Sequence, residues 1–167
     1  MTGNFEPILV LTTGGTIDKL YFDALSDYKV GDSVVARLFE IGRVTHPFRI
    51  QEVTRKDSLE LDDADRAAIA AHVAAAPERR IIITHGTDSM TQTAAALAGI
   101  GGKTIVLVGA LAPARFSESD APLNLGMALG TVQAANPGIY ITMNGTVFAG
   151  LEVVKDRSAG AFVQPSG

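Results

Sequence analysis

The sequence predicts an α/β fold, with a doubly wound, mostly parallel β-sheet and helices on both of its faces. Three observations lead to this prediction. Strand patterns alternate with helical patterns along the chain. The runs Pro7–Thr12, Arg80–Thr84 and Thr104–Val108 are apolar almost throughout, as strands of a parallel sheet buried on both faces are. The helical segments are spaced so that they can connect parallel strands.

The first half of the chain is expected to contain two strands, two helices and one loop. Pro7–Thr12 is the first buried strand, and Asp18–Tyr28, polar and aromatic without a clear period, is predicted to be a mobile loop. Asp32–Gly42 has apolar residues at helical spacing before a closing glycine. Phe48–Val53 alternates as a strand does. Asp62–Ala76, rich in Asp and Ala and followed by proline, is the clearest helix.

The second half continues this alternation. Strands and helices in turn are expected at Arg80–Thr84, Ser89–Leu97, Thr104–Val108, Leu123–Ala135 and Ile139–Thr142. The run Met143-Asn144-Gly145-Thr146 indicates a tight turn into a short returning strand, because Asn-Gly suits the positive φ of a hairpin turn.

The chain of 167 residues is large enough to bury one core and suits a single domain.

The composition narrows the possible functions. Hydrophobic residues make up 47% of the chain and charged residues 19%, which is typical of a globular protein. The net charge is -4 and no basic block is present, so a small-molecule substrate is expected and no nucleic-acid partner. No apolar run approaches about 20 residues and no signal peptide is visible, so we expect no membrane partner and a cytoplasmic location.

Some kinds of chemistry can be set aside at this stage. The chain contains no cysteine, which excludes disulfides, thiol nucleophiles and thiolate metal sites. No phosphate-binding loop, dinucleotide fingerprint or pair of histidines at zinc spacing is present. We therefore expect neither a cofactor nor a metal.

Two threonines follow buried strands and are the first candidates for chemistry. Thr16 ends the run Thr13-Gly14-Gly15-Thr16, and Thr87 lies in His85-Gly86-Thr87-Asp88-Ser89. In an open α/β sheet the carboxyl ends of parallel strands share one edge, where ligands bind. The glycines let the backbone turn sharply and leave amide N–H groups for an oxyanion. The alternative for the first motif is a strand-ending turn or a phosphate-binding loop without catalysis.

Three more residues have both a catalytic and a structural interpretation. Asp88 could polarise a hydroxyl, or it could cap the following helix. His85 could act as a base, or it could be a hydrogen-bonded structural histidine. Lys155 could deprotonate a hydroxyl if it is desolvated beside a carboxylate, or it could be an ordinary surface lysine.

With these motifs assembled, the chain resembles the amino-terminal catalytic domain of bacterial-type L-asparaginases. The resemblance rests on Thr13–Ile17 and His85–Met90, and on Val108–Ala110, Pro122–Leu125 and Met143–Val147 in the same order. It implies a three-layer fold of Rossmann or flavodoxin type, with residues 1–167 forming one catalytic domain that lacks the family's smaller C-terminal domain. It also implies that L-asparagine is hydrolysed to L-aspartate and ammonia, with a weak side activity on L-glutamine.

The resemblance assigns a role to each catalytic candidate. Thr16 is similar to the family's nucleophile, which forms a covalent acyl-enzyme. Thr87, Asp88 and Lys155 resemble its second triad, in which the lysine and the aspartate polarise the threonine hydroxyl. Tyr28 resembles the loop tyrosine that assists the first threonine, and Tyr21, closer to Thr16 in sequence, competes for that role.

Substrate binding is implied for four further positions, namely Gly15, Asp57, Ser58 and Ala110. Ser58 matches the serine that binds the substrate carboxylate, and Ala110 matches the residue whose backbone contacts the amide. Leu59 departs from the family, because it replaces a polar residue and cannot form a hydrogen bond with substrate.

Two other functions stay open at this point. One is a non-catalytic module that binds aspartate or asparagine, and the other is an amidohydrolase acting on a larger amide, such as one carried on transfer RNA. A homo-oligomer, either a dimer or a tetramer, is also expected, because surface that a second domain covers in longer relatives would otherwise be exposed.

Overall fold

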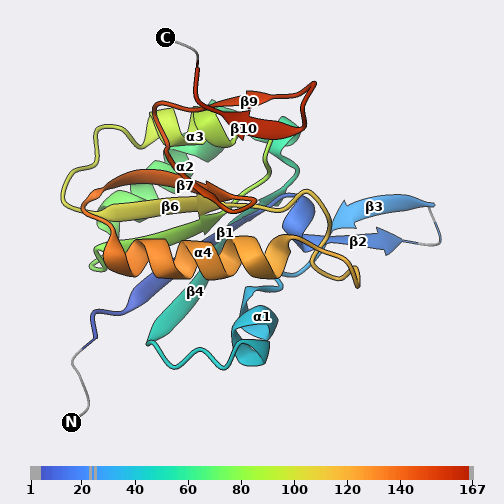
Figure 1. The fold of residues 1–167 in the computed structure, drawn as a ribbon, viewed down its shortest axis with the longest axis horizontal. Coiled ribbons are helices and arrows are strands. Elements are labelled where there is room, and N and C mark those ends of the chain that lie inside the picture. Colours follow the sequence, from blue (N-terminus) through green and yellow to red (C-terminus); the bar gives the residue numbers. More distant parts are fainter. Residues whose placement is uncertain (1–4, 23, 25, 166–167) are drawn as a thin grey trace.

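The computed structural model describes residues 5–22, 24 and 26–165, and its centre is a six-stranded sheet (Figure 1). The strand order is β4-β1-β5-β6-β7-β8. The strands are β1 (Ile8–Gly14), β4 (Phe48–Lys56), β5 (Arg80–Thr84), β6 (Thr104–Val108), β7 (Gly138–Met143) and β8 (Thr146–Ala149). The first five are mutually parallel, and β8 returns antiparallel to β7 after the Asn144-Gly145 turn. This confirms the predicted doubly wound, mostly parallel sheet.

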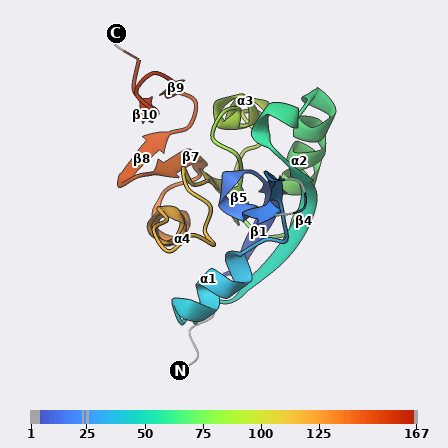
Figure 2. The ribbon, with the colours of Figure 1, turned by 90° about the vertical axis from the view of Figure 1, so that its right-hand side faces the viewer.

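In the described ranges, four α-helices cover the sheet in two layers. They are α1 (Val35–Ile41), α2 (Asp63–Ala75), α3 (Met90–Ala96) and α4 (Ala121–Ala134). Figure 2 shows α1 and α4 on one side of the sheet and α2 and α3 on the other. None of the helices in the described part of the chain is long and apolar enough to cross a membrane.

Each face of the sheet has its own hydrophobic core, because strand side chains alternate between the faces. Leu9, Leu11, Ile81 and Ile83 pack toward the side of α2 and α3. Ile8, Val10, Ile82, Val106 and Val108 pack toward α1 and α4. The apolar runs noted in the sequence are therefore strands buried on both faces.

Two short hairpins were not predicted. The segment interpreted as a mobile loop contains β2 (Lys19–Phe22) and β3 (Asp27–Val30), which pair antiparallel and project from the body of the molecule (Figure 1). Near the end of the chain β9 (Val154–Asp156) pairs with β10 (Ala161–Val163) beside α3 (Figure 1). All four strands are short, and β3 is largely exposed, so neither hairpin carries a clear burial pattern in the sequence.

Candidate functional site

The two threonine loops meet at the carboxyl edge of the sheet, where β1 and β5 lie side by side. Gly15 has a φ of 88°, and a Cβ atom placed on it would overlap the backbone nitrogen of Gly86. Thr16 and Thr87 each follow one of these two glycines. Residues far apart in sequence thus come together because parallel neighbouring strands end at the same edge.

Thr87, Asp88 and Lys155 form a hydrogen-bonded cluster. The Lys155 Nζ donates to Thr87 Oγ1 at 2.6 Å and to Asp88 Oδ1 at 2.5 Å. Lys155 lies on β9, and only 14% of its side chain is exposed. It is therefore not an ordinary surface lysine. Asp88 does not cap α3, whose N-cap residue is Ser89.

Ser58 lies against this cluster from a third segment. It is buried in a short 3-10 helix, η3 (Ser58–Glu60), which follows β4. The Asp88 backbone N–H donates to Ser58 Oγ at 3.2 Å, and Ser89 Oγ donates to the Ser58 carbonyl at 2.6 Å. The structure thus brings Ser58 to Asp88 and Ser89.

Asp57 supports the turn that carries Ser58. It caps η3 in a capping box with Glu60 and forms an ion pair with Lys19. Burial alone would raise the pKa of the Asp57 carboxyl, but the hydrogen bond and charge of Lys19 hold that pKa below its ordinary value. The carboxylate is thus ionised and already paired at neutral pH.

Ala110 lies beneath the same edge, on the loop after β6. It is buried and packs in one small cluster with Ile17, the residue after Thr16. The loop is held by Asp120, whose carboxylate accepts hydrogen bonds from Leu111 and Ala112 N–H at 3.0 Å. The Asn124 side chain donates to Asp120 and to the Gly109 carbonyl, which ties this loop to α4.

His85 is structural. Its side chain is fully buried, with Nδ1 2.6 Å from the Gly86 carbonyl and Nε2 2.7 Å from Thr93 Oγ1. A carbonyl can only accept, so Nδ1 carries the proton and Nε2 accepts from the threonine. Burial lowers the pKa of His85 to about 4, so the ring is neutral at pH 7.

Tyr21 and Tyr28 face each other across the β2–β3 hairpin. Their ring centroids are 5.4 Å apart, and about half of each side chain is exposed. The Tyr28 ring also lies 6.0 Å from that of Phe116, on the loop after β6. Within the described residues neither tyrosine hydroxyl forms a hydrogen bond with Thr16, so the choice between them stays a prediction.

Asp18, two residues after Thr16, is a buried carboxylate that the sequence analysis did not single out. Its Oδ1 accepts from the Val34 N–H at 2.9 Å, and its backbone carbonyl accepts from Arg115 at 2.9 Å. Burial raises the pKa of Asp18 to about 6, although the Val34 hydrogen bond and the charge of Arg115 oppose the rise.

A cavity of about 330 Å³ opens beside the Lys155 cluster. It is lined by Leu59, Asp88, Leu111, Lys155, Arg157 and Gly160. Leu59 and Leu111 are 70% and 49% exposed, so the mouth of the cavity is apolar. Arg157 brings a second cation to it.

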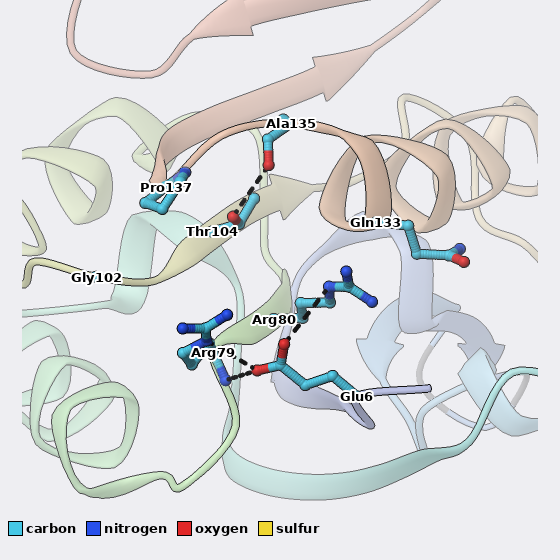
Figure 3. Close-up of a pocket in the computed structure, with 8 residues that line it drawn as sticks. All are labelled: Glu6, Arg79, Arg80, Gly102, Thr104, Gln133, Ala135 and Pro137. Atoms are coloured by element: carbon cyan, nitrogen blue, oxygen red, sulfur yellow. Dashed lines mark hydrogen bonds and ion pairs between the residues drawn. The ribbon is translucent and has the colours of Figure 1, made fainter. Parts of the chain in front are cut away.

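A smaller cavity of about 140 Å³ lies at the opposite end of the sheet, where β5 and β6 begin (Figure 3). Glu6 pairs there with Arg79 at 3.2 Å and with Arg80 at 4.0 Å, and Thr104 Oγ1 donates to the Ala135 carbonyl. These groups satisfy one another. The candidate site is therefore the cavity at the carboxyl edge, where open α/β sheets bind ligands.

Leu111, Arg157 and the Asp120–Asn124 pair were missed as parts of the site. Arg157 lies in the turn that follows β9, a strand that was not predicted, so no sequence signal placed it beside Lys155. Asn124 is a buried polar residue within a helix of apolar residues. No group of three or more His, Asp or Glu side chains in the described ranges could hold a metal ion.

Comparison with known proteins places this arrangement in a family. A family model described as asparaginase, N-terminal, matches residues 7–166. L-asparaginase 2 of Escherichia coli is 32% identical over 166 residues, which cover 90% of this chain and 47% of that protein. The structure of the thermostable L-asparaginase from Thermococcus kodakarensis superposes with a TM-score of 0.83 at 30% identity, covering 95% of this chain and 51% of that one.

A relative with a different name is also found. It is a component of the glutamyl-tRNA(Gln) amidotransferase of Pyrobaculum aerophilum, and it is 36% identical over 141 residues, which cover 78% of this chain and 33% of that protein. The chain thus spans about half the length, or less, of the relatives that it matches.

Proposed function

This chain belongs to the asparaginase family, and we propose that it hydrolyses L-asparagine to L-aspartate and ammonia, with a weak activity on L-glutamine. The observation that carries the proposal is the cluster of Thr87, Asp88 and Lys155 beside the Thr16 loop. A hydroxyl, a carboxylate and a largely buried amine within hydrogen-bond distance form a proton-handling group.

In the first step the Thr16 oxygen attacks the side-chain amide carbonyl of asparagine. The carbon–nitrogen bond breaks, ammonia leaves, and an ester joins the aspartyl group to Thr16. The Thr16 backbone N–H is proposed to stabilise the oxyanion, because the Gly15 N–H already donates to the Lys56 carbonyl at 2.9 Å. Tyr28, with Tyr21 as its competitor, is proposed to assist this threonine.

In the second step water attacks the ester and releases aspartate, which restores the Thr16 hydroxyl. Lys155 takes up and returns the protons through Thr87, and Asp88 holds the lysine in place. Ser58 and the Ala110 backbone line the substrate's position from two other loops, with Asp57 fixing the turn of Ser58.

Ammonia release from L-asparagine by the purified chain tests the proposal. Thr16→Ala and Lys155→Met are each expected to abolish it, whereas Thr146→Ala, an exposed threonine on β8, is the matched control and keeps it. Circular dichroism verifies that each variant is folded. Unchanged turnover in both site variants would overturn the assigned roles.

One other activity has a specific observation in its favour. The similarity to an amidotransferase component named for glutamyl-tRNA leaves open an amide carried on transfer RNA. The acidic balance of the chain opposes this, since RNA binding draws on clustered cations. Tight RNA retention in a filter-binding assay would favour it over free asparagine.

A homo-oligomer, dimer or tetramer, is part of the proposal. Helix α4 contains no charged residue, yet Leu123 on it and Ile41 at the end of α1 are both about 60% exposed. Apolar side chains exposed over neighbouring helices favour association. A stable monomer in light scattering would contradict the proposed homo-oligomer.

A further inference from the structure

Arg157 gives the candidate pocket a charge balance that the proposed catalytic roles do not explain. The pocket contains two cations, Lys155 and Arg157, and one carboxylate, that of Asp88. Asp88 Oδ1 already accepts from Lys155 at 2.5 Å. Within the described part of the chain the Arg157 guanidinium has neither an ion pair nor a hydrogen bond. Whichever protonation state Lys155 has during the reaction, the Arg157 charge is unpaired among the described residues and available to a ligand.

The turn that carries Arg157 is held in a fixed shape. It joins β9 to β10, and Asp156 Oδ1 accepts hydrogen bonds from Ser158 N–H, Ser158 Oγ and Ala159 N–H at 2.6 to 3.1 Å. Lys155 on β9 is fixed in turn by Thr87 and Asp88. The backbone position of Arg157 is thus fixed, and its exposed side chain is free to reach a ligand in the pocket that it lines.

A carboxylate is the ligand group that fits this surplus charge. A guanidinium offers paired N–H donors that match the two oxygens of a carboxylate. An ammonium group fits less well, because the one carboxylate among the described lining residues, that of Asp88, is already paired with Lys155. Leu59 and Leu111 add apolar walls, which suit the carbon chain between an amide and a carboxylate.

We infer that Arg157 binds the carboxylate of the substrate alongside Ser58, and that the pocket selects ω-monoamides of dicarboxylic acids with or without an α-amino group. The inference rests on the proposed amide hydrolysis and names its substrate class. Succinamate, which is asparagine without its amino group, is then a substrate: with water it gives succinate and ammonia. β-Alaninamide, which is asparagine without its carboxylate, is a poor one.

Ammonia release from these three amides tests the inference. We expect kcat/KM for succinamate to lie within about threefold of that for asparagine, and that for β-alaninamide to be lower by about tenfold or more. Arg157→Gln should raise KM for asparagine and for succinamate about tenfold and leave KM for β-alaninamide unchanged. Arg157→Lys should restore part of the loss, and Arg43→Gln, an exposed arginine outside the pocket lining, should change nothing.

The outcomes separate this inference from the proposed function. If asparagine is hydrolysed while succinamate is not, or if Arg157→Gln leaves KM for asparagine unchanged, the inference is wrong and the asparaginase proposal stands. If none of the amides is hydrolysed, the proposed function fails. The inference about Arg157 is then tested separately, by calorimetry of succinate binding. Succinate binding by the unchanged chain that is lost in Arg157→Gln supports it, and equal or absent binding in both overturns it.

Discussion

Gly15 and Gly86 pack backbone against backbone, although they lie on loops that follow two different strands. A Cβ atom on Gly15 would overlap Gly86 N and lie 2.5 Å from Gly86 Cα. This contact fixes how closely the loops of Thr16 and Thr87 approach, so the candidate site depends on a spacing that only glycine permits at this φ.

The first prediction concerns this contact. Gly15→Ala is expected to lower the free energy of unfolding by about 3 kcal/mol, because backbone strain and overpacking add. Gly102→Ala is the matched control, since Gly102 also has a positive φ, 74°, but nothing lies within 4 Å of its would-be Cβ. It should lose only about 1–2 kcal/mol. Urea unfolding measures both, and equal losses would show that the contact does not matter.

A second prediction concerns three buried threonines at the carboxyl ends of β1, β5 and β7. The hydroxyls of Thr12, Thr84 and Thr142 have no hydrogen-bond partner among the described residues. Thr84→Val removes a buried unsatisfied group at almost constant volume and should raise the free energy of unfolding by about 1 kcal/mol. Thr13→Val should lower it by a similar amount, because Thr13 Oγ1 donates to the Thr84 carbonyl at 2.7 Å. A loss of stability in Thr84→Val would contradict this.

Asp18 gives a prediction of pH dependence. Its pKa is about 6 in the fold against 3.8 for an ordinary aspartate, so between these values the folded state binds a proton that the unfolded state does not. Stability from this group is therefore lost as pH rises from about 4 to 6. Asp18→Asn should be more stable than the unchanged chain above pH 6, by about 3 kcal/mol at most, and the difference should vanish near pH 4.

Asp120 is expected to give a pH dependence of stability opposite to that of Asp18. Burial alone would raise its pKa, but hydrogen bonds from Leu111, Ala112 and the two asparagine side chains hold that pKa below the ordinary value. Its contribution is present at neutral pH and is lost on acidification. Asp120→Asn should therefore destabilise the protein most near pH 7. Parallel pH profiles for the two variants would contradict both assignments.

The hairpin tyrosines can be separated by their hydroxyls. Tyr28 contacts Phe116 on the loop after β6, whereas Tyr21, among the residues that the structure describes, has a ring contact with Tyr28 only. We expect Tyr28→Phe to lower kcat for asparagine by about 100-fold. Tyr21→Phe keeps the ring pair and should leave kcat near its original value. The reverse order would assign the role to Tyr21.

Most of the sheet could be predicted from the sequence. The runs Arg80–Thr84 and Thr104–Val108 were predicted with the bounds that the structure has, because strands buried on both faces carry a continuous apolar signal. The helix predicted at Asp62–Ala76 was confirmed as Asp63–Ala75. The β2–β3 and β9–β10 hairpins were missed, since their strands have only three or four residues, too few to show a periodic pattern.

The candidate site was predictable only in part. Thr16 and Thr87 could be placed at one edge, because parallel neighbouring strands end together. The position of Lys155 could not be predicted, since it depends on the β9–β10 hairpin, which was itself not predicted. Arg157 and Asp18 were missed because their importance comes from charge balance and burial, which exist only in the folded chain. The cytoplasmic location and the homo-oligomer stay predictions.

The central claim of the proposed mechanism is that Thr16 is the nucleophile and that it shares one site with Thr87 and Lys155. Mass spectrometry of the protein, mixed with L-asparagine and quenched with acid within milliseconds, can detect the covalent intermediate itself. We expect an aspartyl ester on Thr16, located by fragmenting the tryptic peptide that ends at Lys19, and no ester in Thr16→Ala. An ester on Thr87, or rapid turnover by Thr16→Ala, would show that Thr16 is not the nucleophile.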